Sequence, residues 1–236
     1  MAIPDGGPTT VYARRVADNE APAIARRVRF TPMSLYLIRH GETALNAARV
    51  LQPVDTPLGP LGLRQAEAIA RRIAGLGIAA IVSSDQRRAL QTAEAIAAAT
   101  GLPIAADALL QERNFGTLRG LPYDTLGFDP LAMTEAPAGG ESMSAFAHRI
   151  AQAFARLLAL HARAGGPLAV VTHGLVIQAV LQAHASLPTG TALPQRIGNT
   201  SLTIVCAQQP HIVTLLDSTS HLDAGAADRV GGLSGG

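Results

Sequence analysis

The sequence predicts an α/β domain, namely a three-layer α/β/α sandwich with a mainly parallel central sheet. Short apolar runs of strand length alternate along the chain with longer segments in which apolar residues recur at helical spacing. Those helical segments are ten or more residues long, which is typical of the crossovers that join parallel strands. The composition agrees with a globular fold, because 48% of the residues are hydrophobic and 15% are charged.

The first half of the chain is expected to supply three strands and two helices. The run "LYLI" at 35–38 predicts a buried strand, and "AAIVSS" at 79–84 predicts a second one. A helix is expected within 61–76 and another over 86–99, each followed by glycines that end it. A short strand near 104–106 completes this half. The first helix has apolar residues at helical spacing: Leu63, Ala66, Ile69, Ala70 and Ile73.

The second half predicts two helices and three strands. A long helix is expected over 142–164, a buried strand at 167–171 and a further helix over 174–185. The runs at 201–207 and 211–216 predict two closing strands, which pair as a hairpin or lie at the sheet edge.

The two ends of the chain are expected to lie outside this domain. Residues 1–33 lack clear periodicity and are predicted to be a disordered N-terminal extension, and Met33 directly precedes the first strand. Residues 219–236 end in a Gly- and Ala-rich stretch that predicts a flexible C-terminal tail. The domain itself is therefore placed at 34–218.

The composition excludes several kinds of chemistry. The chain contains no lysine, so a Schiff base or the lysine of a phosphate-binding P-loop is excluded. Its one cysteine, Cys206, allows no internal disulfide and fits a reducing cytoplasm. No apolar run approaches the roughly 18 residues of a membrane span, so no membrane partner is expected. Residues 1–33 hold five of the 19 arginines and three of the 17 acidic residues, which leaves a neutral body that argues against nucleic-acid binding.

Polar residues follow three of the predicted strands at the point where each strand ends. The segments are "RHGE" after 35–38, "SSDQRR" after 79–82 and "THG" after 168–171. The carboxyl ends of parallel strands meet at one edge of a sheet, and ligands bind there. These polar residues are therefore expected to converge on one site.

Arg39, His40 and Gly41 are the first candidates for that site. An arginine offers a planar fork that suits phosphate oxygens, and a neutral imidazole is a nucleophile near pH 7. Gly41 lets the backbone turn sharply beside a ligand. The alternative is an ordinary strand end covered by polar residues, and the tripeptide alone does not decide between the two.

Arg88 is expected in the first turn of the helix over 86–99, where Ser84 or Asp85 could cap the helix. Side chains in a helix lean toward its N-terminus, so Arg88 could reach past that end to an anion, whereas Arg87 is interpreted as solvated. His173 follows the strand at 167–171 as His40 follows the first, and could donate to a phosphoryl oxygen.

Glu112 could act as a proton donor, because a nearby phosphate dianion would raise the pKa of its carboxyl group by repulsion between like charges. The alternative is a surface pair with Arg113. Glu141 is interpreted as a turn or cap residue, and Glu42 as a partner in a structural salt bridge. Neither His40 nor His173 has companions at metal-ligand spacing, so no metal site is expected.

Taken together, these blocks resemble the histidine phosphatase superfamily, the phosphoglycerate-mutase-like enzymes. The resemblance spans roughly residues 35 to 205, and the blocks occur in the family's order: "LIRHGETALN", "DTPLGPLGLRQA", "SSDQRRALQTA", "ERNFGTLRG", "GGES" and "VVTHG".

The resemblance implies a role for each matching residue. His40 is the nucleophile that becomes phosphohistidine, Glu112 is the proton donor and later the base that activates water, and Asn46 contacts the phosphate. The charge-stabilising clamp consists of Arg39, Arg88 and His173. Further candidates for substrate binding are Arg113 and Gly174. The family needs no metal or other cofactor.

The chain departs from the family pattern at three positions. Leu45 replaces a tryptophan, Pro53 replaces a glycine and Arg119 replaces a glutamate common in the family's phosphatases. The mutases carry a long insertion before the second histidine, whereas residues 117–140 here predict only a short cap. A more open site favours hydrolysis.

The sequence therefore predicts a cytoplasmic, metal-independent phosphomonoesterase that acts on a small phosphorylated metabolite through phosphohistidine. The alternatives are a phosphoglycerate-mutase-type phosphoryl transfer and a catalytically idle protein that binds a phosphorylated ligand. A homodimer stays open.

Overall fold

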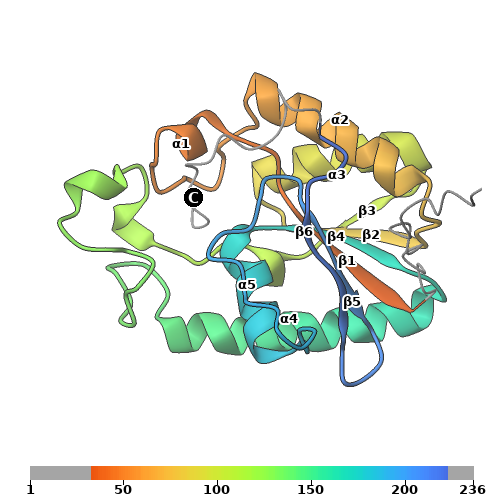
Figure 1. The fold of residues 1–236 in the computed structure, drawn as a ribbon. Helices are drawn as coiled ribbons and strands as arrows, with labels where there is room; N and C mark the ends of the chain where they lie inside the picture. Colours follow the sequence, from red (N-terminus) through yellow and green to blue (C-terminus); the bar gives the residue numbers. More distant parts are fainter. Residues whose placement is uncertain (1–32, 223–236) are drawn as a thin grey trace, which may run out of the picture.

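The computed structural model describes residues 33–222, which form a six-stranded sheet covered by helices on both faces (Figure 1). The predicted N-terminal extension, apart from Met33, and residues 223–236 of the predicted tail lie outside the described residues. The predicted tail begins at 219, yet residues 219–222 still lie against the domain. There the His221 ring contacts the guanidinium of Arg72 at 3.1 Å and the hydroxyl of Thr200 at 3.3 Å.

The sheet has the strand order β3-β2-β4-β1-β5-β6, and its first four strands are parallel. These four are β1 (Ser34–Arg39), β2 (Ala80–Ser83), β3 (Ile104–Ala106) and β4 (Leu168–Thr172). The last two, β5 (Leu202–Cys206) and β6 (Val213–Ser218), pair antiparallel with each other at one edge. The expected three-layer architecture, with a mainly parallel sheet and a closing pair at its edge, is confirmed.

Alternation along the central strands divides the core into two halves. Leu35 and Leu37 face the helices α4 (Met143–Ala164) and α5 (Gly174–Ala183). Tyr36 and Ile38, from the same strand, pack instead with α2 (Pro60–Ala74) and α3 (Arg87–Thr100) on the opposite face. Because side chains of a strand point alternately to its two faces, a central strand buried on both faces has to be apolar throughout.

Three strand ends meet at the same edge of the sheet. Arg39 at the end of β1 lies opposite Thr172 at the end of β4, and Ser83 at the end of β2 lies opposite Val171. The pairing continues for one more residue, since the amide of His40 donates to Thr172 at 2.9 Å and the amide of Ser84 donates to Val171 at 2.9 Å. The convergence expected from the sequence is therefore present.

Two further segments surround this edge. The short helix α1 (Ala44–Ala47) follows β1 and was not expected from the sequence. The residues between Glu112 and α4, 113–142, form a cap of turns and the 3-10 helices η2 (Gly116–Leu118) and η3 (Tyr123–Thr125), with a further 3-10 helix, η1 (Ala108–Leu110), before it. The cap lies beyond the strand ends beside α1 (Figure 1), and a backbone bridge joins Pro122 to Val50.

Candidate active site

His40 lies at the end of β1 and its side chain is fully buried. Its Nδ1 atom lies 2.7 Å from the carbonyl oxygen of Gly41, so Nδ1 carries the proton and donates it to this acceptor. That bond fixes the tautomer in which Nε2 has the free lone pair. The backbone oxygen of His40 accepts from the side-chain Nδ2 of Asn199 at 2.9 Å, which holds the turn in place. The imidazole is thus arranged as a nucleophile through Nε2.

The turn after His40 depends on two glycines in close contact. A Cβ atom on Gly62 would lie 2.0 Å from the carbonyl oxygen of Glu42, and one on Gly41 would lie 2.5 Å from the carbonyl oxygen of Gly62. Both neighbours are backbone atoms, which cannot rotate away. The first turns of α2 can therefore pack against the catalytic turn only because neither residue has a side chain.

His173 and His40 follow the ends of the paired strands β4 and β1, and their rings lie next to each other. The two ring centroids are 5.1 Å apart and the ring planes are inclined by 58°. The Nε2 atom of His173 lies 2.9 Å from the hydroxyl of Ser84, and that hydroxyl already accepts from the amide of Gln86. We assign the Ser84 hydroxyl as the donor in this contact, which places the proton of a neutral His173 on Nδ1.

This Nδ1 atom is buried and has no hydrogen-bond partner within residues 33–222. Burial lowers the pKa of His173 well below its usual value, and the positive charge of Arg88 adds to this effect. A neutral His173 presents one N–H group toward the space beside His40. A buried donor without a partner is costly, and an anionic ligand would satisfy it.

Arg39 and Arg88 place two cations beside the histidines, and both are 1% exposed. The Nη1 atom of Arg88 donates to the backbone oxygen of Pro53 at 3.1 Å, while its Nε atom has no partner among the residues that the structure describes. Burial lowers the pKa of Arg88 to about 10, partly offset by the negative charge of Glu112, so the guanidinium stays charged at neutral pH.

Asn46, in the short helix α1, supplies another donor. Its Oδ1 atom accepts from the amide of Thr43 at 3.2 Å and its own amide donates to the Thr43 hydroxyl at 3.0 Å. These two bonds form a capping box, which is why a helix of only four residues is stable here. The Nδ2 atom of Asn46 and the Nε2 atom of Gln52 are buried without a partner in the described part of the chain.

Glu112 lies fully within the site, at 3% exposure. Its two carboxyl oxygens accept from the backbone amides of Arg113 at 2.9 Å and Leu175 at 3.3 Å. Burial raises the pKa of Glu112 to about 7, against the opposing effect of these two hydrogen bonds and of Arg88. A carboxyl group with this pKa can donate a proton at neutral pH and take one back.

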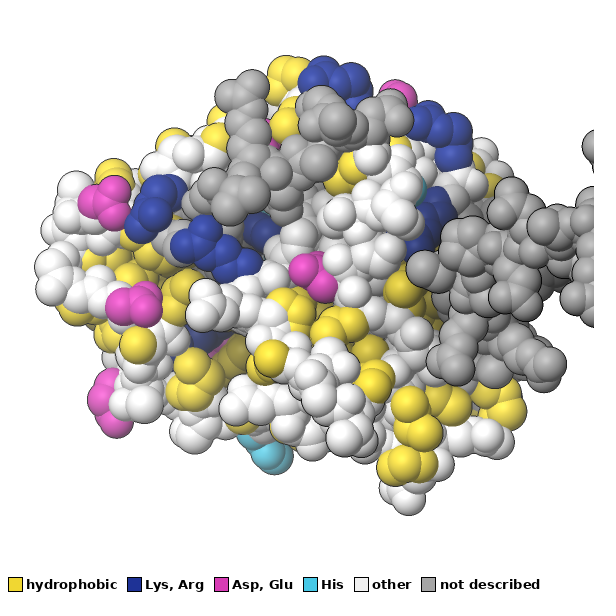
Figure 2. Space-filling model, viewed as in Figure 1, with side chains coloured by type: hydrophobic (Ala, Val, Ile, Leu, Met, Phe, Trp, Pro, Cys, Tyr) yellow, Lys and Arg dark blue, Asp and Glu magenta, His cyan; other side chains and the backbone are white. Residues whose placement is uncertain are grey.

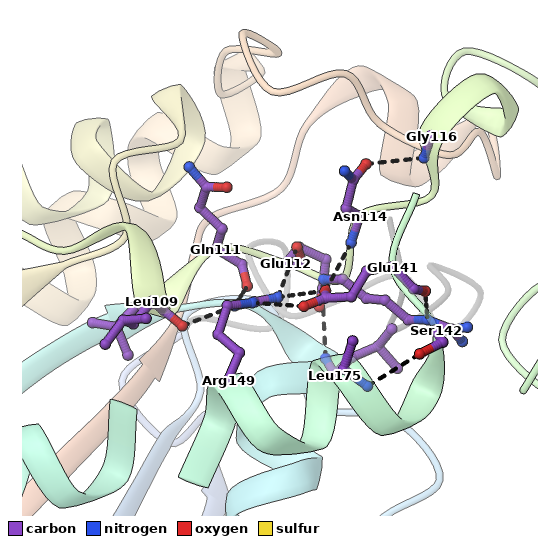
Figure 3. Close-up of polar contacts among 12 residues, drawn as sticks. Leu109, Gln111, Glu112, Asn114, Gly116, Glu141, Ser142, Arg149 and Leu175 are labelled. Atoms are coloured by element: carbon purple, nitrogen blue, oxygen red, sulfur yellow. Dashed lines mark hydrogen bonds and ion pairs between the residues drawn. The ribbon is translucent and has the colours of Figure 1, made fainter. Parts of the chain in front are cut away.

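The backbone around Glu112 is held by an ion pair that the sequence did not reveal (Figure 3). The guanidinium of Arg149 binds both carboxyl oxygens of Glu141, at 2.9 and 2.8 Å, and it also donates to the carbonyl oxygens of Leu109 and Gln111 at 2.8 Å each. Arg149 comes from α4 and Glu141 from the residues before it. Glu141 belongs to the "GGES" block, which was interpreted as a turn or cap, and no sequence block marks Arg149.

One sequence-based interpretation needs correction. Neither Ser84 nor Asp85 is the N-cap of α3; the helix begins after Gln86, which forms no side-chain cap, and Ser84 contacts His173 instead. The guanidinium of Arg113, which was expected to bind substrate, donates to the carbonyl oxygens of Glu141 and Glu135. Its Nη1 atom is buried without a partner among the described residues, so substrate binding by Arg113 stays a prediction.

The other candidate site residues predicted from the sequence lie together at this edge of the sheet. Gly174 is buried as the first residue of α5, directly after His173. Arg39, His40, Arg88, Glu112 and His173 form one buried cluster whose charges act on one another, because the pKa of Glu112 responds to both arginines and that of His173 responds to His40.

Two other kinds of feature are absent from residues 33–222. No three His, Cys, Asp or Glu side chains within this range come together as ligands of a metal ion would. None of the helices formed by these residues is long and apolar enough to cross a membrane.

Comparison with known proteins supports the arrangement. The family model of the histidine phosphatase superfamily (branch 1) matches residues 35–216. A protein named probable phosphoglycerate mutase GpmB from Yersinia pestis is 35% identical over 214 residues, which cover 84% of this chain and 99% of that protein.

Two solved structures share the fold. A mycobacterial glucosyl-3-phosphoglycerate phosphatase in complex with VO3 superposes with a TM-score of 0.67 at 31% identity, over 79% of this chain and 100% of that one. An Escherichia coli structure described as a putative alpha-ribazole-5'-P phosphatase has a TM-score of 0.69 at 24% identity, over 80% and 97% of the two chains. This second likeness concerns the fold alone.

Proposed function

Because this chain belongs to the histidine phosphatase superfamily, we propose that it is a phosphomonoesterase which hydrolyses a small phosphate ester through a phosphohistidine at His40. The observation that carries the proposal is the set of donors around this histidine. Arg88 Nε, His173 Nδ1 and Asn46 Nδ2 are all buried without a partner in the described part of the chain. A phosphoryl group bound there would satisfy all three.

In the first step, Nε2 of His40 attacks phosphorus in line with the ester bond. The bond between phosphorus and nitrogen forms as the bond between phosphorus and the ester oxygen breaks. Glu112, protonated near its pKa of about 7, gives its proton to the departing oxygen. Arg39, Arg88 and His173 stabilise the charge on the equatorial oxygens during the transfer.

In the second step, water attacks the phosphohistidine. The carboxylate of Glu112 takes a proton from that water, the bond between phosphorus and nitrogen breaks, and inorganic phosphate leaves. The Nδ1–H bond to the Gly41 carbonyl keeps the imidazole in the tautomer that can start the next cycle. One carboxyl group therefore serves as acid and then as base.

Hydrolysis is preferred over mutase chemistry because of the cap. Residues 113–142 contain only turns and short 3-10 helices before α4 begins at Met143, and so offer little to exclude water from the phosphoenzyme. The solved structure of the mycobacterial glucosyl-3-phosphoglycerate phosphatase, which shares the fold, supports the same choice. A mutase stays the second candidate because a relative with 35% identity is named probable phosphoglycerate mutase.

A single assay separates the two candidates. The protein is incubated with 3-phosphoglycerate and 2,3-bisphosphoglycerate in the presence of EDTA, and inorganic phosphate and 2-phosphoglycerate are both measured. The phosphatase proposal expects net release of inorganic phosphate, unaffected by EDTA. Conversion to 2-phosphoglycerate without net phosphate release would support the mutase.

A panel of other phosphate esters in the same plates would identify the better substrates. If no ester, including p-nitrophenyl phosphate, is turned over at any pH, the remaining alternative is a protein that only binds phosphorylated ligands. The compartment is also a proposal: the single Cys206 fits a reducing cytoplasm, where we expect the enzyme to act.

A further inference from the structure

Thr92 is a buried polar residue of α3 to which the proposed reaction gives no role. Its side chain is 0% exposed. Its hydroxyl donates to the carbonyl oxygen of Arg88 at 2.9 Å, and the amide of Gly41 donates to the same hydroxyl at 3.0 Å. A carbonyl oxygen can only accept and an amide can only donate, so both directions are fixed. One hydroxyl therefore joins the first turn of α3 to the turn that follows His40.

Only one of these two bonds is ordinary for a threonine in a helix. A threonine hydroxyl often bonds the carbonyl oxygen four residues before it, and Thr100 of the same helix bonds Ile96 in this way at 2.8 Å. The bond from Gly41 joins residues 51 positions apart in the chain. Thr92 is also the only partner of the buried Gly41 amide within residues 33–222. Loss of the hydroxyl would leave that N–H group without a partner.

Gly41 is the residue that holds the nucleophile. Its carbonyl oxygen accepts from Nδ1 of His40 at 2.7 Å, which leaves Nε2 free to attack phosphorus. No side chain fits at Gly41, since its Cβ atom would lie 2.5 Å from the backbone oxygen of Gly62 in α2. A glycine has the least restricted backbone of any residue, so this turn gains no rigidity from its own side chain. The bond to Thr92 supplies a restriction from outside the turn.

The other contact of Thr92 lies at the base of the phosphate clamp. Arg88 is in the first turn of α3, and Thr92 bonds its carbonyl oxygen. The hydroxyl thus keeps the backbone that carries Arg88 next to the backbone that holds His40. This spacing matters, because the reacting atoms must meet in line and a displacement of about 1 Å can cost about 100-fold in rate.

Thr92 acts on the site without contacting the phosphate. Figure 2 shows arginine side chains gathered on the face between the cap and α1. Thr92 adds no charge to them, and the single proton of its hydroxyl is already donated to the Arg88 carbonyl. It therefore has no donor left for a phosphate oxygen, and its effect on the reaction passes through Gly41 and Arg88.

We propose that Thr92 is a positioning residue for phosphoryl transfer to His40. Its hydroxyl holds Gly41, so that the Gly41 carbonyl keeps the imidazole in the tautomer and direction needed for attack. The same hydroxyl keeps Arg88 in register with this turn. The inference rests on the proposed function, because the step that Thr92 serves is the phosphorylation of His40.

The variant Thr92→Val tests the role of the hydroxyl, because valine keeps the branched shape and lacks that group. The rate constant for phosphorylation of His40 is measured in a single turnover by rapid quench, per folded protein as judged by circular dichroism. We expect it to fall by about 10- to 100-fold. The factor should be the same for glycerol 3-phosphate and p-nitrophenyl phosphate, since both meet the same nucleophile. A defect in proton donation would instead affect glycerol 3-phosphate more.

Two further variants separate positioning from a general loss of structure. Thr92→Ser keeps the hydroxyl and should retain most of the rate. Thr100→Val is the matched control, because Thr100 bonds the carbonyl of Ile96 in the same helix and also accepts from the amide of Leu102 at 3.4 Å. It lies about 12 Å further along the helix, and its replacement should leave the rate unchanged.

A second readout does not depend on turnover. The imidazole nitrogens of His40 are observed by ¹⁵N NMR at pH 8 in histidine-labelled protein and are assigned with His40→Ala. We expect one neutral tautomer, with the proton on Nδ1, in the wild type and in Thr100→Val. In Thr92→Val we expect a mixture of the two tautomers, because the Gly41 carbonyl is no longer held.

The two readouts distinguish this inference from the proposed function. If the wild type hydrolyses esters and Thr92→Val phosphorylates His40 as fast as Thr100→Val does, the positioning role is wrong and the phosphatase proposal stands. If the wild type turns over no ester, the phosphatase proposal fails. The NMR spectra then decide the role of Thr92, and a single Nδ1–H tautomer in Thr92→Val would overturn it.

Discussion

Replacement of Glu112 by glutamine should change how the stability of the protein depends on pH. The pKa of this carboxyl group rises from 4.5 to about 7 on folding, chiefly through burial. The folded state therefore holds a proton that the unfolded state has lost between these two values, so the free energy of unfolding falls as pH rises through this window. At about 1.4 kcal/mol for each unit of pKa, the loss attributable to Glu112 is about 3 kcal/mol.

The assay is urea denaturation of the wild type and Glu112→Gln at pH 4.5 and at pH 8. Other titrating groups, including His173, are common to both proteins and largely cancel in the comparison. Glutamine places an NH₂ group where one of the two carboxyl oxygens accepts from a backbone amide, so the variant starts less stable at pH 4.5. Relative to the wild type, it should gain about 3 kcal/mol between the two pH values. A relative gain below about 0.5 kcal/mol would refute the raised pKa.

The same variant tests the chemical role of Glu112. For a poor leaving group such as glycerol 3-phosphate, kcat should fall by about 10²–10⁴-fold, because general acid catalysis contributes that much. The loss should be smaller for p-nitrophenyl phosphate, whose leaving group hardly needs a proton, and the phosphoenzyme should accumulate because water is no longer activated. Equal losses on both substrates without accumulation would mean that Glu112 only holds its loop, and Glu42 would be the next candidate for the acid.

Three further substitutions test the supporting structure. Arg149→Met removes the ion pair with Glu141 and the hydrogen bonds that hold the backbone before Glu112. We expect the free energy of unfolding, measured by urea denaturation, to fall by about 2–3 kcal/mol, and kcat to fall more for glycerol 3-phosphate than for p-nitrophenyl phosphate. Equal losses of kcat on the two esters would contradict a positioning role. Ser84→Ala should lower kcat about tenfold on both esters, since the tautomer of His173 is no longer fixed, and unchanged kcat would contradict that tautomer. Gly62→Ala should lower the free energy of unfolding by at least about 3 kcal/mol, because the new Cβ would lie 2.0 Å from a carbonyl oxygen. A variant that melts like the wild type would contradict that contact.

The sheet edge could be predicted from the sequence because its signals are local. Each of the strands β1, β2 and β4 is an apolar run that ends in polar residues, and parallel pairing alone brings these ends together. The order of the strands and their register could not be predicted, because they depend on packing between segments far apart in the chain. The helix α1 was missed because four residues give no helical periodicity; its stability comes from the reciprocal bonds of Thr43 and Asn46.

Some of the site residues could likewise be predicted from local sequence signals, and others could not. His40, Arg88 and His173 could be predicted because each sits at a recognisable strand end or helix start. Arg113 was a candidate for substrate binding by resemblance, but its contacts with the carbonyl oxygens of Glu141 and Glu135 could not be predicted, because they depend on how the cap folds back. The pair of Arg149 and Glu141 could not be predicted, since nothing in the sequence indicates that both reach the backbone before Glu112.

The most direct test of the account is to trap the phosphoenzyme. Wild-type protein is mixed with a phosphate ester, quenched within milliseconds in base, where phosphohistidine is stable, and examined by intact mass and peptide mapping. We expect a gain of one phosphoryl group located on His40, and no gain on His40→Ala, which should also release no phosphate. Phosphate release without any phosphorylated intermediate, or a base-stable, acid-labile phosphoryl group on the His40→Ala variant, would contradict the assignment of His40 as the nucleophile.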